Sequence, residues 1–314
     1  MRKIYQQVAK LPLINILWRK MRLKNILQNH QSVADFWKPI IKDYSEDKIK
    51  KYNLLPKQNL PTNKIIWQYW GQGIHASNIP EIVHLCFASV DQYKGDYQVI
   101  RLDDNSIIDY IDLPDFVLEK RNNPSFNRTF FSDLLRLALL KAYGGVWLDA
   151  TILMTGPLPQ KLIDLDYFMF QRSEDALYKA YWESTYAYYW SWNPNFKVRV
   201  LNSIFFGKKD GVMITILLDL MLYYWKTKSD IPDYFFFQIL YNELVTGKMS
   251  NFQCLVLSDT IPHIIQTKVN GEFDDISYSD ILRQSTLHKM AYYEKSALRK
   301  LKDILINYKI INNI

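Results

Sequence analysis

The sequence predicts an α/β fold, a mostly parallel sheet flanked by helices, preceded by an N-terminal helical extension. Strand-like and helix-like segments alternate between residues 64 and 170, an order typical of parallel sheets with crossover helices. The 314 residues suffice for one large α/β domain with appendages. Hydrophobic residues make up 48% and charged residues 23%, which excludes a disordered or coiled-coil chain. We therefore divide the chain into an extension, 1–60, and an α/β domain, 61–314.

The extension is basic. Residues 1–34 hold seven Lys or Arg and no acid, matching the net charge of +7 for the whole chain. Apolar residues recur between them at near-helical spacing. Two interpretations stay open: a helix packed on the domain, or an amphipathic helix on an anionic membrane surface, where each basic residue contributes about 1 kcal/mol. Basic and aromatic residues do not interleave, so no nucleic-acid partner is expected.

The extension is expected to be neither a secretory signal nor a membrane span. Its apolar stretch 11–18 includes Pro12 and Asn15 and is shorter than the 20 or so residues that a span requires. Cys86 and Cys254 form no CxxC pair or Cys/His cluster, so we expect neither a disulfide scaffold nor a zinc site. A reducing, cytoplasmic location follows from this interpretation.

The α/β domain is read in order from its hydrophobic patterns. Two prolines in 54–61 mark its boundary, and glycines or polar residues separate the segments that follow. Strands are predicted at 64–70, 97–102, 146–148 and 167–170. Helices are predicted at 80–93, 132–143 and 212–225, with a further amphipathic segment around 295–305 that is expected to contact a membrane surface.

One group of polar residues surrounds the 146–148 strand. Asp149 follows this strand, at the edge where open α/β sheets bind ligands. Asp133 and Arg136 are three residues apart and share a helix face, so they could fix a polyhydroxylated ligand while Asp149 holds a divalent cation. Gly144 and Gly145 would allow a ligand to approach closely. The structural alternative is that Ser132 caps the helix and the glycines merely end it.

Three motifs resemble the capsular polysaccharide synthesis glycosyltransferases, relatives of DXD-containing sugar transferases with a GT-A fold. They are Ile65–Gly71, Ser132-Asp133-x-x-Arg136, and Tyr143–Thr151. The chain looks most like a bacterial capsular α-galactosyltransferase. The resemblance implies that the first motif receives the nucleotide and that the second binds the sugar. It implies cofactor-binding roles for these residues: Trp67, Gln68, Tyr69, Trp70, Gly144, Gly145 and Ala150.

The third motif departs from Asp-x-Asp, because Thr151 stands where a second acid is expected. The resemblance implies a metal held by Asp149, Thr151 and His288, with Lys289 meeting the diphosphate. A literal Asp-x-Asp at 164–166 precedes a strand, so we do not assign it to the site.

The middle of the chain is harder to read. Gln238, in Asp233-Tyr234-x-x-x-Gln238, occupies a position from which related transferases present polar groups to the donor, and we count it as catalytic with Asp133, Arg136 and Asp149. The segment 182–192 holds three Trp and three Tyr, which favours either a sugar-stacking platform or a mixed aromatic core.

The resemblance implies a nucleotide-sugar-dependent hexosyltransferase of capsular repeat-unit synthesis that uses Mn²⁺ or Mg²⁺. It further implies retaining transfer of α-galactose from UDP-galactose to a lipid-diphosphate-linked sugar, at the cytoplasmic face of the plasma membrane as a peripheral protein. Two alternatives stay open. A glycoside hydrolase would use Asp133 and Asp149 as its paired carboxylates, and a non-catalytic protein would bind carbohydrate through the aromatic residues.

Overall fold

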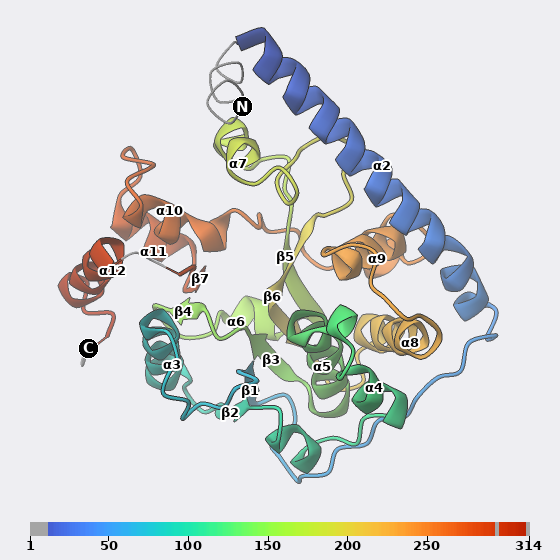
Figure 1. Ribbon diagram of the computed structural model, residues 1–314. Coiled ribbons are helices and arrows are strands. Elements are labelled where there is room, and N and C mark those ends of the chain that lie inside the picture. The colour runs from blue at the N-terminus through green and yellow to red at the C-terminus, as the bar shows by residue number, and fades with distance from the viewer. Residues whose placement is uncertain (1–11, 293–294, 312–314) are drawn as a thin grey trace.

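The computed structural model describes residues 12–292 and 295–311. Its centre is a five-stranded sheet in the order β2-β1-β3-β6-β5 (Figure 1). The strands of this sheet are β1 (Ile65–Tyr69), β2 (Gln98–Leu102), β3 (Gly145–Leu148), β5 (Tyr167–Gln171) and β6 (Val200–Gly207). A separate two-stranded sheet pairs β4 (Ile152–Met154) with β7 (Leu287–Lys289).

The strand directions confirm a mostly parallel α/β sheet. Strand β1 pairs in parallel with β2 and with β3. Strand β6 pairs antiparallel with both β3 and β5. Four strands therefore run in one direction and β6 runs against them, so the carboxyl ends of β1, β2, β3 and β5 meet at one edge of the sheet.

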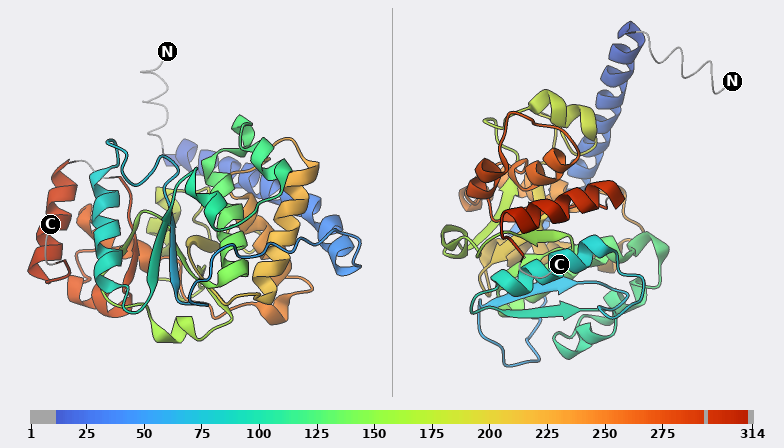
Figure 2. Two further views of the ribbon diagram at one scale, coloured as in Figure 1. Left: turned by 90° about the horizontal axis from the view of Figure 1, so that it is seen from below. Right: turned by 90° about the vertical axis from the view of Figure 1, so that its left-hand side faces the viewer.

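Helices cover the two faces of the sheet unequally (Figures 1 and 2). Helix α5 (Arg128–Tyr143) lies against β1, β3 and β6, and α8 (Val212–Thr227) packs on α5. Together with α9 (Phe236–Val245) they form the larger core. On the other face a smaller core gathers around β4 and α6 (Gln160–Ile163), with α3 (Glu81–Tyr93) packed on β4.

Shorter elements connect these layers. Apart from the long N-terminal helix, the other α-helices are α4 (Asp115–Lys120), α7 (Lys179–Thr185), α10 (Ile264–Val269), α11 (Tyr278–Gln284) and α12 (Lys295–Asn307). The 3₁₀ helices are η1 (Ser106–Asp109), η2 (Pro124–Phe126), η3 (Ser250–Phe252) and η4 (Ile261–His263).

The N-terminal segment forms one long helix, α2 (Pro12–Ser45), and residues 1–11 of the predicted extension lie outside the described residues. Its C-terminal half packs on α8 and α9, where Trp37 is fully buried against Tyr224 and Phe236. The opposite end projects past α7, and its Trp18 stays 64% exposed (Figure 1). The helix therefore combines a packed half with an exposed, basic half. In the described part of the chain, we find no helix with the length and hydrophobicity to span a membrane.

The C-terminal amphipathic segment is helical as predicted, in α12. Its apolar residues Leu301, Ile304 and Leu305 are buried in the core, and Lys302 pairs with Glu81 of α3. This burial corrects the expectation that the apolar side of this segment contacts a membrane.

Helix α5 begins four residues earlier than the sequence predicts. Its N-cap is Asn127, whose Oδ1 accepts hydrogen bonds from the backbone N–H groups of Thr129 and Phe130. The hydroxyl of Ser132 donates instead to the carbonyl of Thr129, at 2.7 Å. Ser132 therefore lies within the helix, and the expectation that it caps the helix is wrong.

The glycine pair has a structural role, which corrects the expectation that it admits a ligand. Gly144 precedes β3 and Gly145 begins it, whereas Asp149 follows the strand, so the pair and the carboxylate lie at opposite edges of the sheet. Their φ angles are +72° and +106°, a region that favours glycine. A Cβ on Gly144 would overlap Asn63, and one on Gly145 would overlap the carbonyl of Ile65.

Candidate active site

The candidate site lies where β3 leaves the sheet. The chain turns from Asp149 into β4, with the backbone N–H of Ile152 donating to the carbonyl of Asp149. Strand β7, far away in sequence, pairs antiparallel with β4 and sets Lys289 opposite Ile152. This pairing brings a C-terminal lysine beside the strand-end carboxylate.

Asp149, Thr151 and Lys289 form the accessible part of the site. The Lys289 ammonium donates to Asp149 Oδ2 at 2.9 Å and to Thr151 Oγ1 at 3.0 Å. The side chains of Asp149 and Lys289 remain 28% and 23% exposed. A ligand at this edge of the sheet therefore meets an ion pair of which both members are accessible.

Buried donors hold the other oxygen of Asp149. The indole Nε1 of Trp147 donates to Asp149 Oδ1 at 2.8 Å. The guanidinium of Arg136 lies 3.7 Å from the same oxygen and over the Trp147 ring. Arg136 also pairs with Asp133 at 3.1 Å, as their spacing on one helix face predicts.

Two amides continue this network into the core. Asn202 of β6 donates through Nδ2 to Asp133 Oδ1 at 2.8 Å, and the backbone carbonyl of Asn202 accepts from the guanidinium of Arg136. Gln238 of α9 donates through Nε2 to Asn202 Oδ1 at 3.2 Å. The buried Oε1 of Gln238 has no hydrogen-bond partner among the described residues. Gln238, Asp133 and Arg136 thus form a buried framework behind Asp149.

The two carboxyl groups differ electrostatically. Burial raises the pKa of Asp133 to about 6, against the opposing effect of Arg136. Burial would also raise the pKa of Asp149, but Lys289, Arg136 and the Trp147 hydrogen bond outweigh it and hold that pKa below its usual range. Asp149 is therefore a stable anion at neutral pH, while Asp133 titrates closer to neutrality.

The side chains at this edge do not fit a divalent cation. Mg²⁺ and Mn²⁺ prefer oxygen ligands, and one carboxylate with one hydroxyl is a small set whose free space Lys289 occupies. Within residues 12–292 and 295–311, no three His, Cys, Asp or Glu side chains could hold a metal ion together. The Mn²⁺ or Mg²⁺ expected from the sequence stays a prediction that these donors do not favour.

His288 is separated from the site, which corrects the expectation that it is a metal ligand. It lies opposite Leu153 in the β4–β7 pair, and its ring is fully buried with Nε2 3.0 Å from Thr155 Oγ1. Burial lowers its pKa to about 4, so the imidazole is neutral. Because neighbouring residues on a strand face opposite sides, Lys289 reaches Asp149 and His288 does not.

The predicted nucleotide strand is mostly interior. Trp67 is fully buried, and its Nε1 donates to the carbonyl of Gly144 at 3.0 Å, which corrects the expectation that it contacts a base. Gln68 is buried with Oε1 accepting from Arg101, and Tyr69 bonds to Asp104. Trp70 follows β1 at the same edge as Asp149 and is half-buried, so it alone of the four retains an accessible position.

Ala150 and the 164–166 pair also have clear positions. Ala150 is 6% exposed and belongs to the larger core, so it packs inward and not toward a ligand. Asp166 precedes β5 and pairs with Lys208. Because β5 runs parallel to β3, Asp166 lies at the edge opposite Asp149, as expected for a motif outside the site.

The aromatic segment is largely a core. Trp182, Tyr189 and Trp190 are buried, whereas Tyr188 is 52% exposed. The guanidinium of Arg172 lies over the rings of Tyr189, Trp190 and Trp192 and pairs with buried Asp259 at 2.9 Å. The mixed-core interpretation therefore holds for most of this segment.

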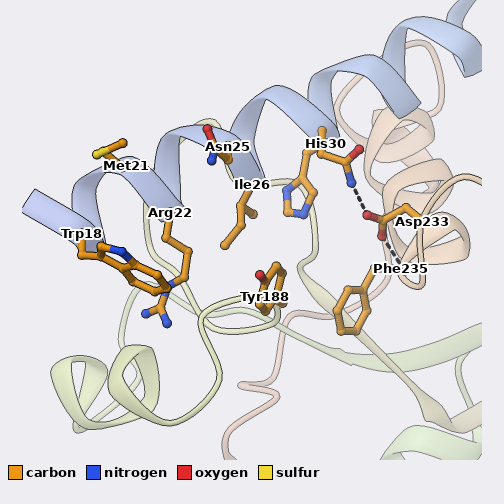
Figure 3. Close-up of a pocket in the computed structure, with 10 residues that line it drawn as sticks. Trp18, Met21, Arg22, Asn25, Ile26, His30, Tyr188, Asp233 and Phe235 are labelled. Atoms are coloured by element: carbon orange, nitrogen blue, oxygen red, sulfur yellow. Dashed lines mark hydrogen bonds between the residues drawn. The ribbon is translucent and has the colours of Figure 1, made fainter. Parts of the chain in front are cut away.

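A cavity of about 470 Å³ lies between α2 and the loops that carry Tyr188 and Asp233 (Figure 3). Trp18, Arg22 and Ile26 line it from α2, and Phe235 lines it from the opposite side. The segment that carries Asp233 and Phe235 continues into Gln238, so one stretch of chain borders both this cavity and the buried framework.

Sequence reasoning did not assign Trp147 or Asn202 to the site. Trp147 lies two residues before Asp149, and this spacing on a strand could have suggested a shared face. For Asn202 the sequence offers only the polar pair Asn202-Ser203 ahead of an apolar run; its contact with Asp133 depends on the antiparallel pairing of β6 with β3.

Comparison with known proteins places these features in context. A family model described as capsular polysaccharide synthesis protein matches residues 18–308. A solved chain titled PaToxG Glycosyltransferase aligns with 94% of this chain and 97% of its own length, at 18% identity and a TM-score of 0.33. That structural likeness is too weak to support an argument. A search of curated proteins returned no match.

Proposed function

Because the chain belongs to the capsular polysaccharide synthesis family, we propose that it is a glycosyltransferase that builds a capsular repeat unit from a nucleotide sugar. The observation that carries the proposal is the accessible Asp149–Lys289 pair at the carboxyl end of β3. Open α/β sheets bind ligands at this edge, and a cation there suits the diphosphate of a sugar donor.

In this proposal the accessible and buried groups have different tasks. Lys289 meets the departing diphosphate, and Trp70 borders the nucleotide. Arg136, Asp133 and Gln238 are positioning residues, because their side chains are buried and hold Asp149 from behind. Retaining transfer on one face of the sugar requires no protein nucleophile, so the proposal needs no further reactive side chain.

The finer assignment follows the family resemblance. The proposed donor is UDP-galactose, the transfer retains the α configuration, and the proposed acceptor is a lipid-diphosphate-linked sugar. The cavity beside α2 supports an acceptor with an apolar and an anionic part, because Trp18 and Met21 are apolar and Arg22 is cationic. Exposed Trp18 and Met21, beside Arg19 and Lys20, support peripheral binding to the cytoplasmic face of an anionic membrane.

A donor screen tests the function. Purified protein is mixed with each common nucleotide sugar in Mn²⁺, Mg²⁺ or EDTA, and release of the nucleoside diphosphate is followed. We expect one donor to be consumed slowly by the natural chain, and at least 100-fold more slowly by Asp149→Asn. If, with every donor, the natural chain releases no more nucleoside diphosphate than Asp149→Asn does, the proposal is contradicted.

A glycoside hydrolase is less well supported. Its two carboxylates must both reach the substrate, but the Asp133 side chain is only 9% exposed and bonded to Asn202 and Arg136. Release of free sugar from capsular polysaccharide without any nucleotide would favour the hydrolase over the transferase.

A further inference from the structure

The position expected for a metal ion beside Asp149 contains the ammonium group of Lys289. We propose that this ammonium takes the role of the divalent cation, so that the chain binds the diphosphate of its donor without a metal. The proposal rests on the proposed glycosyltransferase function and concerns how that same site neutralises its leaving group.

Both oxygens of the Asp149 carboxylate already accept hydrogen bonds. Oδ2 accepts from Lys289 at 2.9 Å, while Oδ1 accepts from Trp147 at 2.8 Å and lies 3.7 Å from Arg136. A divalent cation would have to displace Lys289 and would then find one carboxylate and one hydroxyl, Thr151. Mg²⁺ sites generally use one or two carboxylates together with phosphates, and the Asp149 carboxylate already has two cationic side chains beside it.

The charged side chains around Asp149 already balance one another. Asp133 and Asp149 are balanced by Arg136 and Lys289, so two negative and two positive groups leave no net negative charge to attract a dication. Lys289 can turn toward an anion because its side chain is partly exposed, whereas Arg136 is buried.

The Lys289 ammonium has more donors than its two contacts use. A lysine has three N–H donors, and two of them reach Asp149 and Thr151. Among the described residues, no partner is found for the third. With Nζ fixed at two points and partly open to solvent, this donor is available to a phosphate oxygen.

The chemical step is balanced without a metal. The bond between the sugar C1 and the diphosphate oxygen breaks, and its electron pair stays on the departing nucleoside diphosphate, beside Lys289. The acceptor hydroxyl oxygen forms the new bond to C1, and its proton passes to the departing diphosphate oxygen. The products are the glycoside and the protonated nucleoside diphosphate.

The test measures binding of UDP, GDP and ADP by titration calorimetry, to protein treated with EDTA and to protein in Mn²⁺. We expect the nucleotide that binds to do so with similar affinity in both conditions, within about threefold. Lys289→Met should weaken binding in EDTA by about 10- to 100-fold, the range of a charge-assisted hydrogen bond. The control, Lys208→Met at the opposite edge of the sheet, should bind as the natural chain does.

A complementary variant adds a second carboxylate beside Asp149 to bind a divalent cation. Lys289→Glu supplies a second carboxylate, and we expect it to gain Mn²⁺ binding by electron paramagnetic resonance, which the natural chain should lack. Strong Mn²⁺ binding by the natural chain, with nucleotide binding only in Mn²⁺, would overturn the inference and leave the glycosyltransferase intact. If no nucleotide binds in either condition and no donor is consumed, the proposed function itself fails. Should Lys289→Met not fold, Lys289→Gln and the EDTA titration of the natural chain decide the question.

Discussion

The stability of Asp133→Asn relative to the natural chain should increase as the pH rises. Asp133 lies behind Asp149, hydrogen-bonded to Asn202 and paired with Arg136. Burial raises its pKa from 3.8 to about 6, so the folded state holds the proton more tightly than the unfolded state. The stabilising contribution of that proton is complete below pH 3.8 and is lost as the pH rises through 6.

The magnitude follows from the two pKa values. A pKa raised from 3.8 to about 6 corresponds to about 3 kcal/mol of lost stability once the carboxyl group is ionised. Part of this is already lost at pH 5, so the rise from pH 5 to pH 8 removes a further amount on the order of 1 kcal/mol. An asparagine accepts the same hydrogen bonds through Oδ1 and has no charge to bury, so the variant avoids this loss.

Urea unfolding at pH 5 and pH 8 measures the effect. The free energy of unfolding of Asp133→Asn minus that of the natural chain should grow by an amount on the order of 1 kcal/mol between the two pH values, since other titrating groups are common to both proteins. Asp210→Asn, at an exposed carboxyl group paired with Lys141, is the matched control for replacing a carboxyl group with an amide. A constant or shrinking difference for Asp133→Asn would refute the reasoning.

Three further predictions follow from the site and its surroundings. Gly145→Ala should lower the free energy of unfolding by about 3 kcal/mol or more, because φ is +106° and the added Cβ meets the Ile65 carbonyl. Gly271→Ala has a similar φ of +98° but open space around the added Cβ, so in the same urea titration it should lower the free energy of unfolding clearly less. Trp147→Phe removes a hydrogen bond that lowers the pKa of Asp149, so the acidic limb of the kcat/KM profile should move to higher pH, whereas Trp67→Phe should leave the limb in place. Binding to anionic vesicles in a flotation assay should weaken, most clearly at low salt, when four basic residues of α2 become Gln, and an unchanged vesicle fraction would contradict membrane binding by α2. These four residues are Arg19, Lys20, Arg22 and Lys24.

The sequence predicted the residues whose positions depend on local periodicity. The strand before Asp149 and the helix that carries Asp133 and Arg136 follow from apolar spacing, and the i,i+3 pair meets as helix geometry requires. The order of strands and helices was sufficient for a mostly parallel sheet. The reversed direction of β6 was not predictable in this way, because strand direction depends on pairing across the sheet.

The wrong assignments concern residues whose position depends on strand register or on which end of a strand they occupy. His288 and Lys289 are neighbours, and the register of the three-residue strand β7 determines which one faces Asp149. Gly144 and Asp149 are close in sequence, but the strand between them puts them at opposite edges of the sheet. The Arg172–Asp259 pair joins residues 87 positions apart, which no local pattern in a single sequence indicates.

The network from Gln238 to Lys289 joins a buried end to an accessible end. Gln238 and Asp133 are buried and Asn202 is half-buried, whereas Asp149 and Lys289 are on the accessible side. A substitution at the buried end must change packing and hydrogen bonds as well as the position of Asp149, so it should alter stability and turnover together. Lys289 can move into solvent when its partner is lost, so a substitution at the accessible end should alter turnover with little effect on stability. Five separate elements supply this network, namely α5, the end of β3, β6, α9 and β7, and its geometry therefore depends on the complete fold.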